Sequence, residues 1–187
     1  MVKSVVVIDH PRPFIYAILA DFERYPEWVP GCEACVPVSA NAGVFTVEIT
    51  LNIAKRITFG LRFDTEKDLL LRFDMVSGTD LQVYRGSHKL LNSTDGKGTV
   101  LISKLHVDAG AMAPKFFIER VVEKSLAATG EALCKYAGTK ASGSPPGPIA
   151  PAQNRGRKFR RPKCLLHIVK TEAGEEIWFA GRKFRSF

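Results

Sequence analysis

The feature that most constrains the fold of this chain is a two-residue alternation of apolar and polar side chains in its middle third. The clearest run spans residues 45–53, where all five odd positions carry apolar side chains. Runs of the same period cover residues 59–63, 69–75 and 101–107. Successive side chains of a strand point to opposite faces, so each run predicts a strand with one apolar and one polar face.

Short turn signals separate these runs, at residues 41–43, at Gly78 and at residues 95–98. Consecutive strands joined by short turns pair antiparallel, because parallel neighbours need a long crossover connection. Residues 3–8, which are rich in valine and isoleucine, predict one further strand at the start of the chain. We therefore expect a curved antiparallel sheet of six to seven strands.

Helical patterns precede and follow this group of strands. Residues 14–22 place apolar side chains at helical spacing, and Pro26 and Pro30 confine residues 23–29 to a short, broken helical element. A longer helical pattern covers residues 114–138. We expect that long helix to lie across the concave face of the sheet. The result is an α+β fold, in the order strand, two helices, about six strands and helix, with a cavity between sheet and long helix.

The net charge of +8 is confined to the C-terminal region. Residues 1–138 carry 16 basic and 16 acidic side chains, whereas residues 139–187 carry 11 basic and 3 acidic ones. Residues 139–156 are rich in Gly, Ser, Pro and Ala, a composition that cannot bury enough apolar surface to offset its ordering entropy. We therefore predict a folded domain at 1–138, a flexible linker at 139–156 and a basic tail at 157–187.

The basic tail contains a hairpin signal and interleaves cations with aromatic residues. Residues 164–169 and 176–179 have strand character and flank a turn with a glycine, which predicts a β-hairpin. Cations beside aromatic rings suit contact with RNA or the ribosome, or adsorption to an anionic membrane, and a solvated tail that aids solubility is the alternative. The candidate contacts are Arg157, Lys158, Arg160, Arg161, Arg182, Lys183 and Arg185.

Four cysteines and the start of the chain bear on its compartment. Cys32 and Cys35 have the spacing of metal ligands, but zinc takes about four ligands and no second Cys or His pair lies nearby. No stretch of about 18 apolar residues and no signal-peptide pattern is present. We therefore expect a cytoplasmic protein with reduced thiols, no metal and no cofactor.

The segment that follows the first strand resembles a known superfamily. Asp21, Tyr25, Pro26 and Pro30 form the pattern Asp-x-x-x-Tyr-Pro-x-x-x-Pro, and further likeness lies at residues 78–86, 96–100 and 113–117. These motifs are similar to the START-like, or SRPBCC, superfamily. Within it, the chain looks most like the polyketide cyclase/dehydrase group, which includes coenzyme Q-binding proteins and a ribosome association toxin. The likeness covers about residues 2–137 and none of the tail.

The resemblance implies a helix-grip fold with a deep pocket for a lipid, a quinone or a polyketide-like molecule. Tyr25 and Trp28 flank Pro26 on the short helical element, where they either close the pocket mouth or form a local apolar cluster. Arg85 either meets the polar end of the ligand or reaches solvent. The residues expected to contact ligand are Tyr25, Trp28, Val47, Ile49, Leu61, Phe73, Arg85, Leu105, Phe117 and Val121.

Three classes of function remain open. The leading prediction is a binding or carrier protein for a hydrophobic small molecule, because the sequence contains no nucleophile with its base, no metal site and no phosphate-binding loop. An aromatase/cyclase-type enzyme is the second, with Tyr84, Arg85 and His88 as the candidate catalytic residues. The third is a protein that interacts with the ribosome or RNA through its basic tail. The sequence leaves the oligomeric state unknown.

Overall fold

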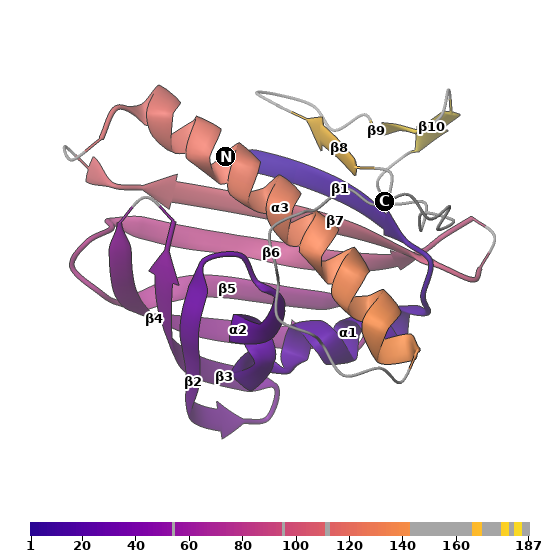
Figure 1. Cartoon of the computed structure of the whole chain (residues 1–187), viewed down its shortest axis with the longest axis horizontal. Helices are drawn as coiled ribbons and strands as arrows, with labels where there is room; N and C mark the ends of the chain where they lie inside the picture. The colour runs from indigo at the N-terminus through magenta and orange to yellow at the C-terminus, as the bar shows by residue number, and fades with distance from the viewer. Residues whose placement is uncertain are drawn as a thin grey trace, which may run out of the picture.

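A curved antiparallel sheet that wraps around one long helix forms the body of the protein (Figure 1). The structure is a computed structural model. It describes residues 1–53, 55–94, 96–110 and 113–142, together with the backbone of three short strands near the C-terminus. The arrangement confirms the predicted α+β helix-grip fold.

Seven strands of the sheet follow the alternation seen in the sequence. They pair antiparallel in the order β2, β3, β4, β5, β6, β7, β1, so the first strand of the chain lies beside β7. Their bounds are β1 (Val2–Ile8), β2 (Cys32–Asn41), β3 (Val44–Asn52), β4 (Arg56–Glu66), β5 (Leu70–Ser77), β6 (Val83–Asn92) and β7 (Thr99–Asp108).

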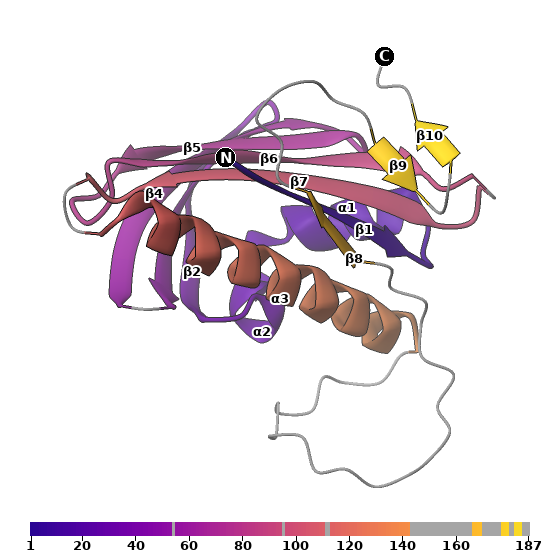
Figure 2. The same ribbon diagram turned by 90° about the horizontal axis from the view of Figure 1, so that it is seen from above.

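The helices lie on the concave side of the sheet (Figure 2). They are α1 (Arg12–Ala20), the 3-10 turn η1 (Phe22–Arg24), α2 (Tyr25–Trp28) and α3 (Lys115–Ala141). Pro13 and Pro26 stand in the first turns of α1 and α2, where a missing backbone N–H costs nothing. Among the described residues, no helix combines the length and the apolar character needed to cross a membrane.

The core fills the space between the sheet and these helices. In register, Val47 lies opposite Leu61 and Phe63 opposite Phe73, so apolar side chains of neighbouring strands share one face. The Phe22 ring lies 4.5 Å from the Phe63 ring, centroid to centroid, which ties the η1 turn to β4. The alternation read from the sequence therefore builds the layer on which the helices pack.

The end of the long helix differs from the prediction. The expected linker begins at residue 139, but α3 continues to Ala141, and Ser142 caps the helix with a side-chain hydrogen bond to the Gly138 carbonyl. The glycine did not end the helix because the residues after it, Thr139, Lys140 and Ala141, are compatible with helical geometry. Residues 143–156 of the predicted linker lie outside the described residues.

The short strands in the tail have other partners than expected. They are β8 (Leu166–Val169), β9 (Ile177–Phe179) and β10 (Arg182–Phe184). The sequence predicted a hairpin of residues 164–169 with 176–179, whereas in the part of the tail that the structure describes β8 pairs with β1 and β9 pairs with β10. The outer edge of β1 offers unpaired backbone N–H and C=O groups, which β8 satisfies as an eighth strand.

The three cysteines that the structure describes are of two kinds. Cys32 and Cys35 are free, buried thiols, and burial raises their pKa values to about 11 and about 12, which keeps them protonated at neutral pH. Cys134 in α3 is disulfide-bonded, so the expectation of reduced thiols is wrong for this residue. A disulfide needs two thiols close in space, and spacing along a sequence cannot establish that.

Candidate ligand-binding site

A cavity of about 330 Å³ lies between the N-terminal half of α3 and the sheet. Its walls come from the end of β3, the start of β4, the loop between β5 and β6, the end of β7 and one face of α3. The lining is mostly aliphatic and aromatic: Leu51, Ile53, Lys55, Ile57, Asp80, Leu81, Tyr84, Leu105, Val107, Ala109, Ala113, Phe117, Ile118, Val121, Val122 and Ser125. Such an enclosure suits an apolar ligand.

A second chamber of about 80 Å³ lies further along α3, beneath α2. It shares Leu51, Ile53, Tyr84, Leu105 and Ser125 with the larger cavity, so the two spaces adjoin. Its other lining residues are Tyr25, Trp28, Val29, Pro30, Ile49, Leu61, Phe63, Phe73, His88, Leu126 and Thr129. The inner chamber therefore brings several hydrogen-bonding side chains to one end of an otherwise apolar space.

The ionisable groups of the inner chamber are neutral at physiological pH. Burial raises the pKa of Tyr84 to about 12 and lowers the pKa of His88 to about 4. Burial also raises the pKa of Tyr25 well above its usual value, and its hydroxyl donates a 2.6 Å hydrogen bond to the Leu19 carbonyl. The chamber is thus polar at several points without carrying a charge.

His88 is held by a hydroxyl on the neighbouring strand. Its Nδ1 lies 2.9 Å from the Ser103 Oγ, and the two residues face each other across β6 and β7. The Phe73 ring lies 5.3 Å from the imidazole, centroid to centroid. These contacts fix the ring, which leaves Nε2 as a donor or an acceptor according to the tautomer. Ser4 extends this polar row onto β1, and its buried Oγ has no partner among the described residues.

Trp28 contributes a further polar group at the chamber wall. It is 4% exposed, and its indole N–H is buried without a hydrogen-bond partner among the described residues. Its ring stacks on Tyr136 of α3, with 6.2 Å between centroids, and Tyr136 donates a 2.7 Å hydrogen bond to Glu27. The same carboxylate accepts a hydrogen bond from Arg24 at 2.8 Å. This set of contacts fastens α2 to the C-terminal half of α3.

The larger cavity has charged and aromatic residues around its outer end. Lys55 forms an ion pair with Asp80, so the only charges among the described lining residues neutralise each other. Phe116 and Phe117 begin α3 and are 74% and 48% exposed, although Phe117 lines the cavity. We therefore place the mouth of the cavity at this end of the helix.

Most of the residues expected to contact ligand lie around these two chambers. Tyr25, Trp28, Ile49, Leu61, Phe73 and Leu105 line the inner one, and Phe117 and Val121 line the outer one together with Leu105. Val47 is fully buried in the core and lines neither chamber. Of the catalytic candidates, Tyr84 and His88 line the inner chamber, whereas Arg85 lies on the opposite face of β6.

Several lining residues escaped the sequence analysis. Lys55, Asp80 and Leu81 come from loops, where no periodic pattern marks a side chain as inward-facing. Ser125 and Thr129 have the helical spacing of the inward-facing side of α3. Because they are polar, the apolar pattern did not identify them as lining residues. The predicted tail contacts Arg157, Lys158, Arg160, Arg161 and Arg185 lie outside the described residues. For Arg182 and Lys183, the structure describes only the backbone of β10.

A curved antiparallel sheet, one long helix across it and an apolar cavity between them define a START-like, helix-grip protein. The sequence profile of a family described as polyketide cyclase / dehydrase and lipid transport matches residues 8–133, which is more than half of the chain. The chain therefore belongs to that family. No curated protein matches the sequence significantly.

Solved structures share this fold at low sequence identity. The Zhui aromatase/cyclase from Streptomyces sp. R1128 is 19% identical, with a TM-score of 0.66, and the match covers 76% of this chain and 96% of that one. A START superfamily protein from Mycobacterium smegmatis is 16% identical, with a TM-score of 0.66 and coverage of 75% and 99%. A STAR-related lipid transfer protein from Xanthomonas axonopodis is 14% identical, with a TM-score of 0.64 and coverage of 73% and 84%.

Proposed function

We propose that this protein binds and carries a hydrophobic small molecule whose polar end is uncharged. The observation that supports this proposal is an apolar cavity of about 330 Å³ that adjoins a smaller chamber with neutral hydrogen-bonding groups. The apolar body of the ligand occupies the outer cavity, beside Phe117 and Val121. Its polar end lies in the inner chamber, near Tyr84, His88 and Trp28.

Because the groups that line the inner chamber are neutral, the chamber discriminates between charged and uncharged ligands. A carboxylate in the inner chamber would lose its hydration and meet no ionised partner among the described lining residues, which makes its burial costly. A ketone, quinone carbonyl, phenol or alcohol has no such cost and finds donors and acceptors there. We therefore favour a quinone-like, polyketide-like or alcohol-headed molecule over a fatty acid.

A matched pair of ligands tests this proposal. The neutral dye Nile red reports occupancy of the cavity by fluorescence, and 1-dodecanol and dodecanoate then compete for it at pH 8. We expect the alcohol to displace the dye at least tenfold more effectively than the carboxylate, because only the carboxylate buries a charge. Equal competition by the two, or no competition by either, would contradict the proposal.

A cavity-filling variant locates the binding. Val121→Trp places a large ring in the outer cavity and should abolish binding of Nile red. Val38→Trp adds the same ring at a position that is 66% exposed and lies outside both chambers, so it should leave binding unchanged. Mass spectrometry of lipid extracts from the purified protein then identifies any ligand that it retains.

An aromatase/cyclase-type activity is the second candidate, favoured by His88 and its hydrogen bond to Ser103 at the chamber wall. A neutral imidazole accepts a proton from a carbon acid such as the methylene of a 1,3-diketone, which is the first step of an aldol cyclisation. Exchange of that methylene proton with deuterium, followed by NMR, tests this step. We expect His88→Gln to remove any acceleration, and exchange no faster than in buffer would rule out this role.

A further inference from the structure

Three large apolar side chains are exposed at the end of the molecule where the ligand cavity has its mouth. Phe116 and Phe117 begin α3 and are 74% and 48% exposed, and Ile53, in the turn between β3 and β4, is 48% exposed. Phe117 and Ile53 line the ligand cavity, whereas Phe116 lines neither chamber. Exposed apolar side chains that gather in one place mark contact with another molecule. Ligand binding inside the cavity therefore does not explain the Phe116 ring.

The helical spacing of α3 places cations beside the two rings. Successive residues of a helix are about 100° apart around its axis, so Arg120 and Lys124 lie between Phe116 and Phe117 on the helix surface. Neither cation forms an ion pair or a hydrogen bond with a residue in the described part of the chain. This side of α3 therefore combines aromatic rings with positive charge.

The acidic residues of the same turns lie apart from these cations. By the same spacing, Glu119 and Glu123 are on the other side of Phe116. Lys124 lines a surface hollow together with Ile53, so the side of α3 with the cations faces the turn between β3 and β4. We call the surface made by the following residues the mouth surface: Ile53, Phe116, Phe117, Arg120 and Lys124.

The hollow beside the mouth surface has a volume of about 390 Å³. Apart from Lys124, its lining includes small and apolar residues such as Val121 and Ala128. The hollow shares Ile53, Val121 and Ser125 with the ligand cavity, so the two spaces adjoin. The mouth surface is thus continuous with the lining of the ligand cavity.

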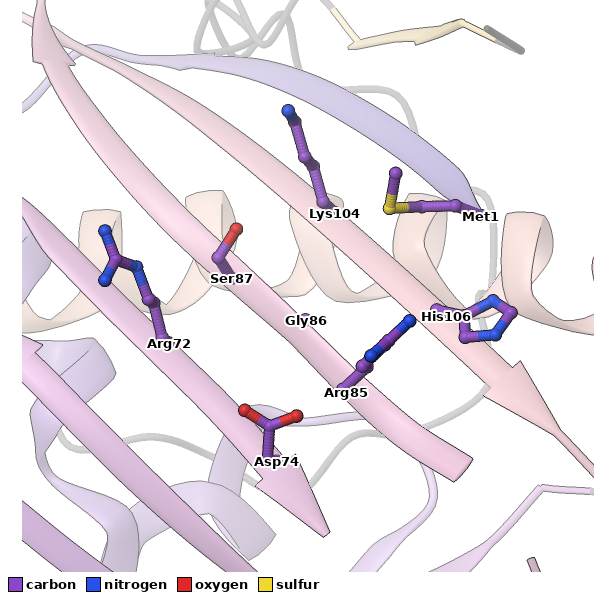
Figure 3. Close-up of a pocket in the computed structure, with 8 residues that line it drawn as sticks. All are labelled: Met1, Arg72, Asp74, Arg85, Gly86, Ser87, Lys104 and His106. Atoms are coloured by element: carbon purple, nitrogen blue, oxygen red, sulfur yellow. The ribbon is translucent and has the colours of Figure 1, made fainter. Parts of the chain in front are cut away.

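The convex face of the sheet, on the far side from the ligand cavity, lacks this combination of groups. A hollow on that face is lined by charged and small side chains, among them Arg72, Arg85 and Lys104 (Figure 3). No Phe, Tyr or Trp is among its described lining residues, and Arg72 pairs with Glu66. In Figure 3 the cationic ends of the three side chains point away from one another. The convex face therefore provides cations without exposed rings, which makes it a suitable control surface.

We propose that the mouth surface docks on a lipid bilayer, so that the ligand passes directly between the membrane and the cavity. Helices that lie in a membrane interface carry residues such as Phe and Leu on their buried side and Lys or Arg beside them. The side chains of Ile53, Phe116 and Phe117 insert among the lipid chains. Arg120 and Lys124 contact the phosphates of the lipid headgroups.

The choice of a bilayer rather than a protein as the partner rests on the proposed function. Phe117 and Ile53 belong both to the mouth surface and to the cavity lining, so a protein seated on them would close the mouth. A bilayer instead presents fluid hydrocarbon, in which a neutral hydrophobic ligand dissolves. Docking there lets the ligand enter the cavity without crossing water.

Flotation of the full chain with phosphatidylcholine vesicles tests the docking. Wild type should float with the vesicles, and Phe116→Glu should weaken binding about tenfold, because a carboxylate replaces an inserted ring. Val38→Glu makes the same kind of change at a valine that is 66% exposed and lies outside both chambers, so it should leave binding unchanged. Absence of flotation by wild type, or equal losses in the two variants, would overturn the proposal.

Vesicles that also contain phosphatidylglycerol test the role of the cations. Arg120→Gln should weaken binding about fivefold, because one cation at an anionic lipid surface is lost. Arg85→Gln removes a cation from the convex face and should change binding less than about twofold. The basic tail is present in both variants, so its contribution is the same in each. Equal losses in the two variants would show adsorption through net charge alone, which contradicts docking by the mouth surface.

Transfer of Nile red from vesicles to the protein separates docking from ligand binding. The rate should rise with vesicle concentration, and Phe116→Glu should slow the transfer about tenfold. Its equilibrium affinity for the dye should stay unchanged, since Phe116 lines neither chamber. A rate independent of vesicle concentration would overturn the docking and leave the proposed function intact, whereas flotation without uptake of the dye would contradict the proposed function. Self-association of wild type that Phe116→Glu abolishes would identify a second copy of the chain as the partner and overturn the docking on a bilayer.

Discussion

The two halves of α3 face the same sheet but make opposite kinds of contact. In the C-terminal half, Leu133 and Ala137 are fully buried and Tyr136 is hydrogen-bonded to α2. In the N-terminal half, Phe117 is 48% exposed and Val121 borders a cavity of about 330 Å³. One helix therefore closes the core at one end and borders the cavity of the proposed ligand site at the other.

This difference shows how the fold keeps a cavity without losing its stability. A void removes dispersion contacts from its lining, so a protein with a large cavity needs tight packing elsewhere. Here the tight packing lies in the C-terminal half of α3, where Leu133 and Ala137 are fully buried and Tyr136 contacts α2. Substitutions at the packed half should lower stability, and substitutions at the open half should change binding instead.

The largest expected effect comes from truncating the packed half. Leu133→Ala should lower the free energy of unfolding by about 3 kcal/mol, because a fully buried leucine leaves a void when its side chain is shortened. Urea denaturation of wild type and variant measures this loss. The matched change at the open half, Val121→Ala, should cost less than about 1 kcal/mol because Val121 already borders a cavity. Equal losses of unfolding free energy at the two positions would show that the two halves of α3 are packed equally tightly.

The next largest effect is expected in the pH dependence of stability, and it arises from His88 in the inner chamber. Burial lowers the pKa of His88 from 6.5 to about 4, so between these pH values the unfolded chain binds a proton at His88 that the folded chain does not. Stability should therefore fall as the pH drops from about 6.5 to about 4, by up to about 3 kcal/mol.

Denaturation midpoints across that pH range test this prediction. The His88→Gln variant keeps a hydrogen-bonding side chain at the position but cannot titrate there, so its stability should depend on pH less steeply than that of wild type. If the two proteins lose stability in parallel between pH 6.5 and 4, His88 is not the group responsible.

A smaller effect is expected at the contact between α2 and α3. Tyr136→Phe removes the hydrogen bond to Glu27 and should lower stability by about 1 kcal/mol. That hydrogen bond is the main reason why the pKa of Glu27 is lowered, so the variant should raise this pKa toward its usual value. An NMR titration of the Glu27 carboxyl group measures the shift. An unchanged Glu27 pKa would show that the hydrogen bond does not persist in solution.

The smallest effect on stability is expected at the mouth of the cavity. Phe117→Ala should change the free energy of unfolding by less than about 1 kcal/mol, since the ring is half exposed. It should nevertheless weaken binding of Nile red severalfold, because the ring lines the cavity. Its neighbour Phe116 is 74% exposed and does not line either chamber, so Phe116→Ala should alter neither property. If the two substitutions change binding of Nile red equally, Phe117 does not lie at the mouth of the cavity.

The strands were predictable from the sequence because the side chains of a strand alternate between two environments. Residues 45–53 show this directly, and Ile49 and Leu51 lie on the buried face of β3 as their odd positions require. The same alternation placed Tyr84 and His88 on one face and Arg85 on the other. It could not say which face of the sheet is turned toward α3, so Arg85 was counted among the ligand contacts although it lies on the opposite face of β6 from the ligand cavity.

The sequence by itself determined the sheet, the long helix and the neutral charge of the domain, because these depend on local periodicity and on counts of side chains. Only the tertiary structure decided that Val47 is sealed in the core while Val121 borders a cavity, and that His88 meets Ser103. Cavities and cross-strand partners depend on how far apart packed layers stand and on strand register. Both are set by contacts between residues that are distant along the chain. A periodic pattern describes only local structure, so it contains no information about such contacts.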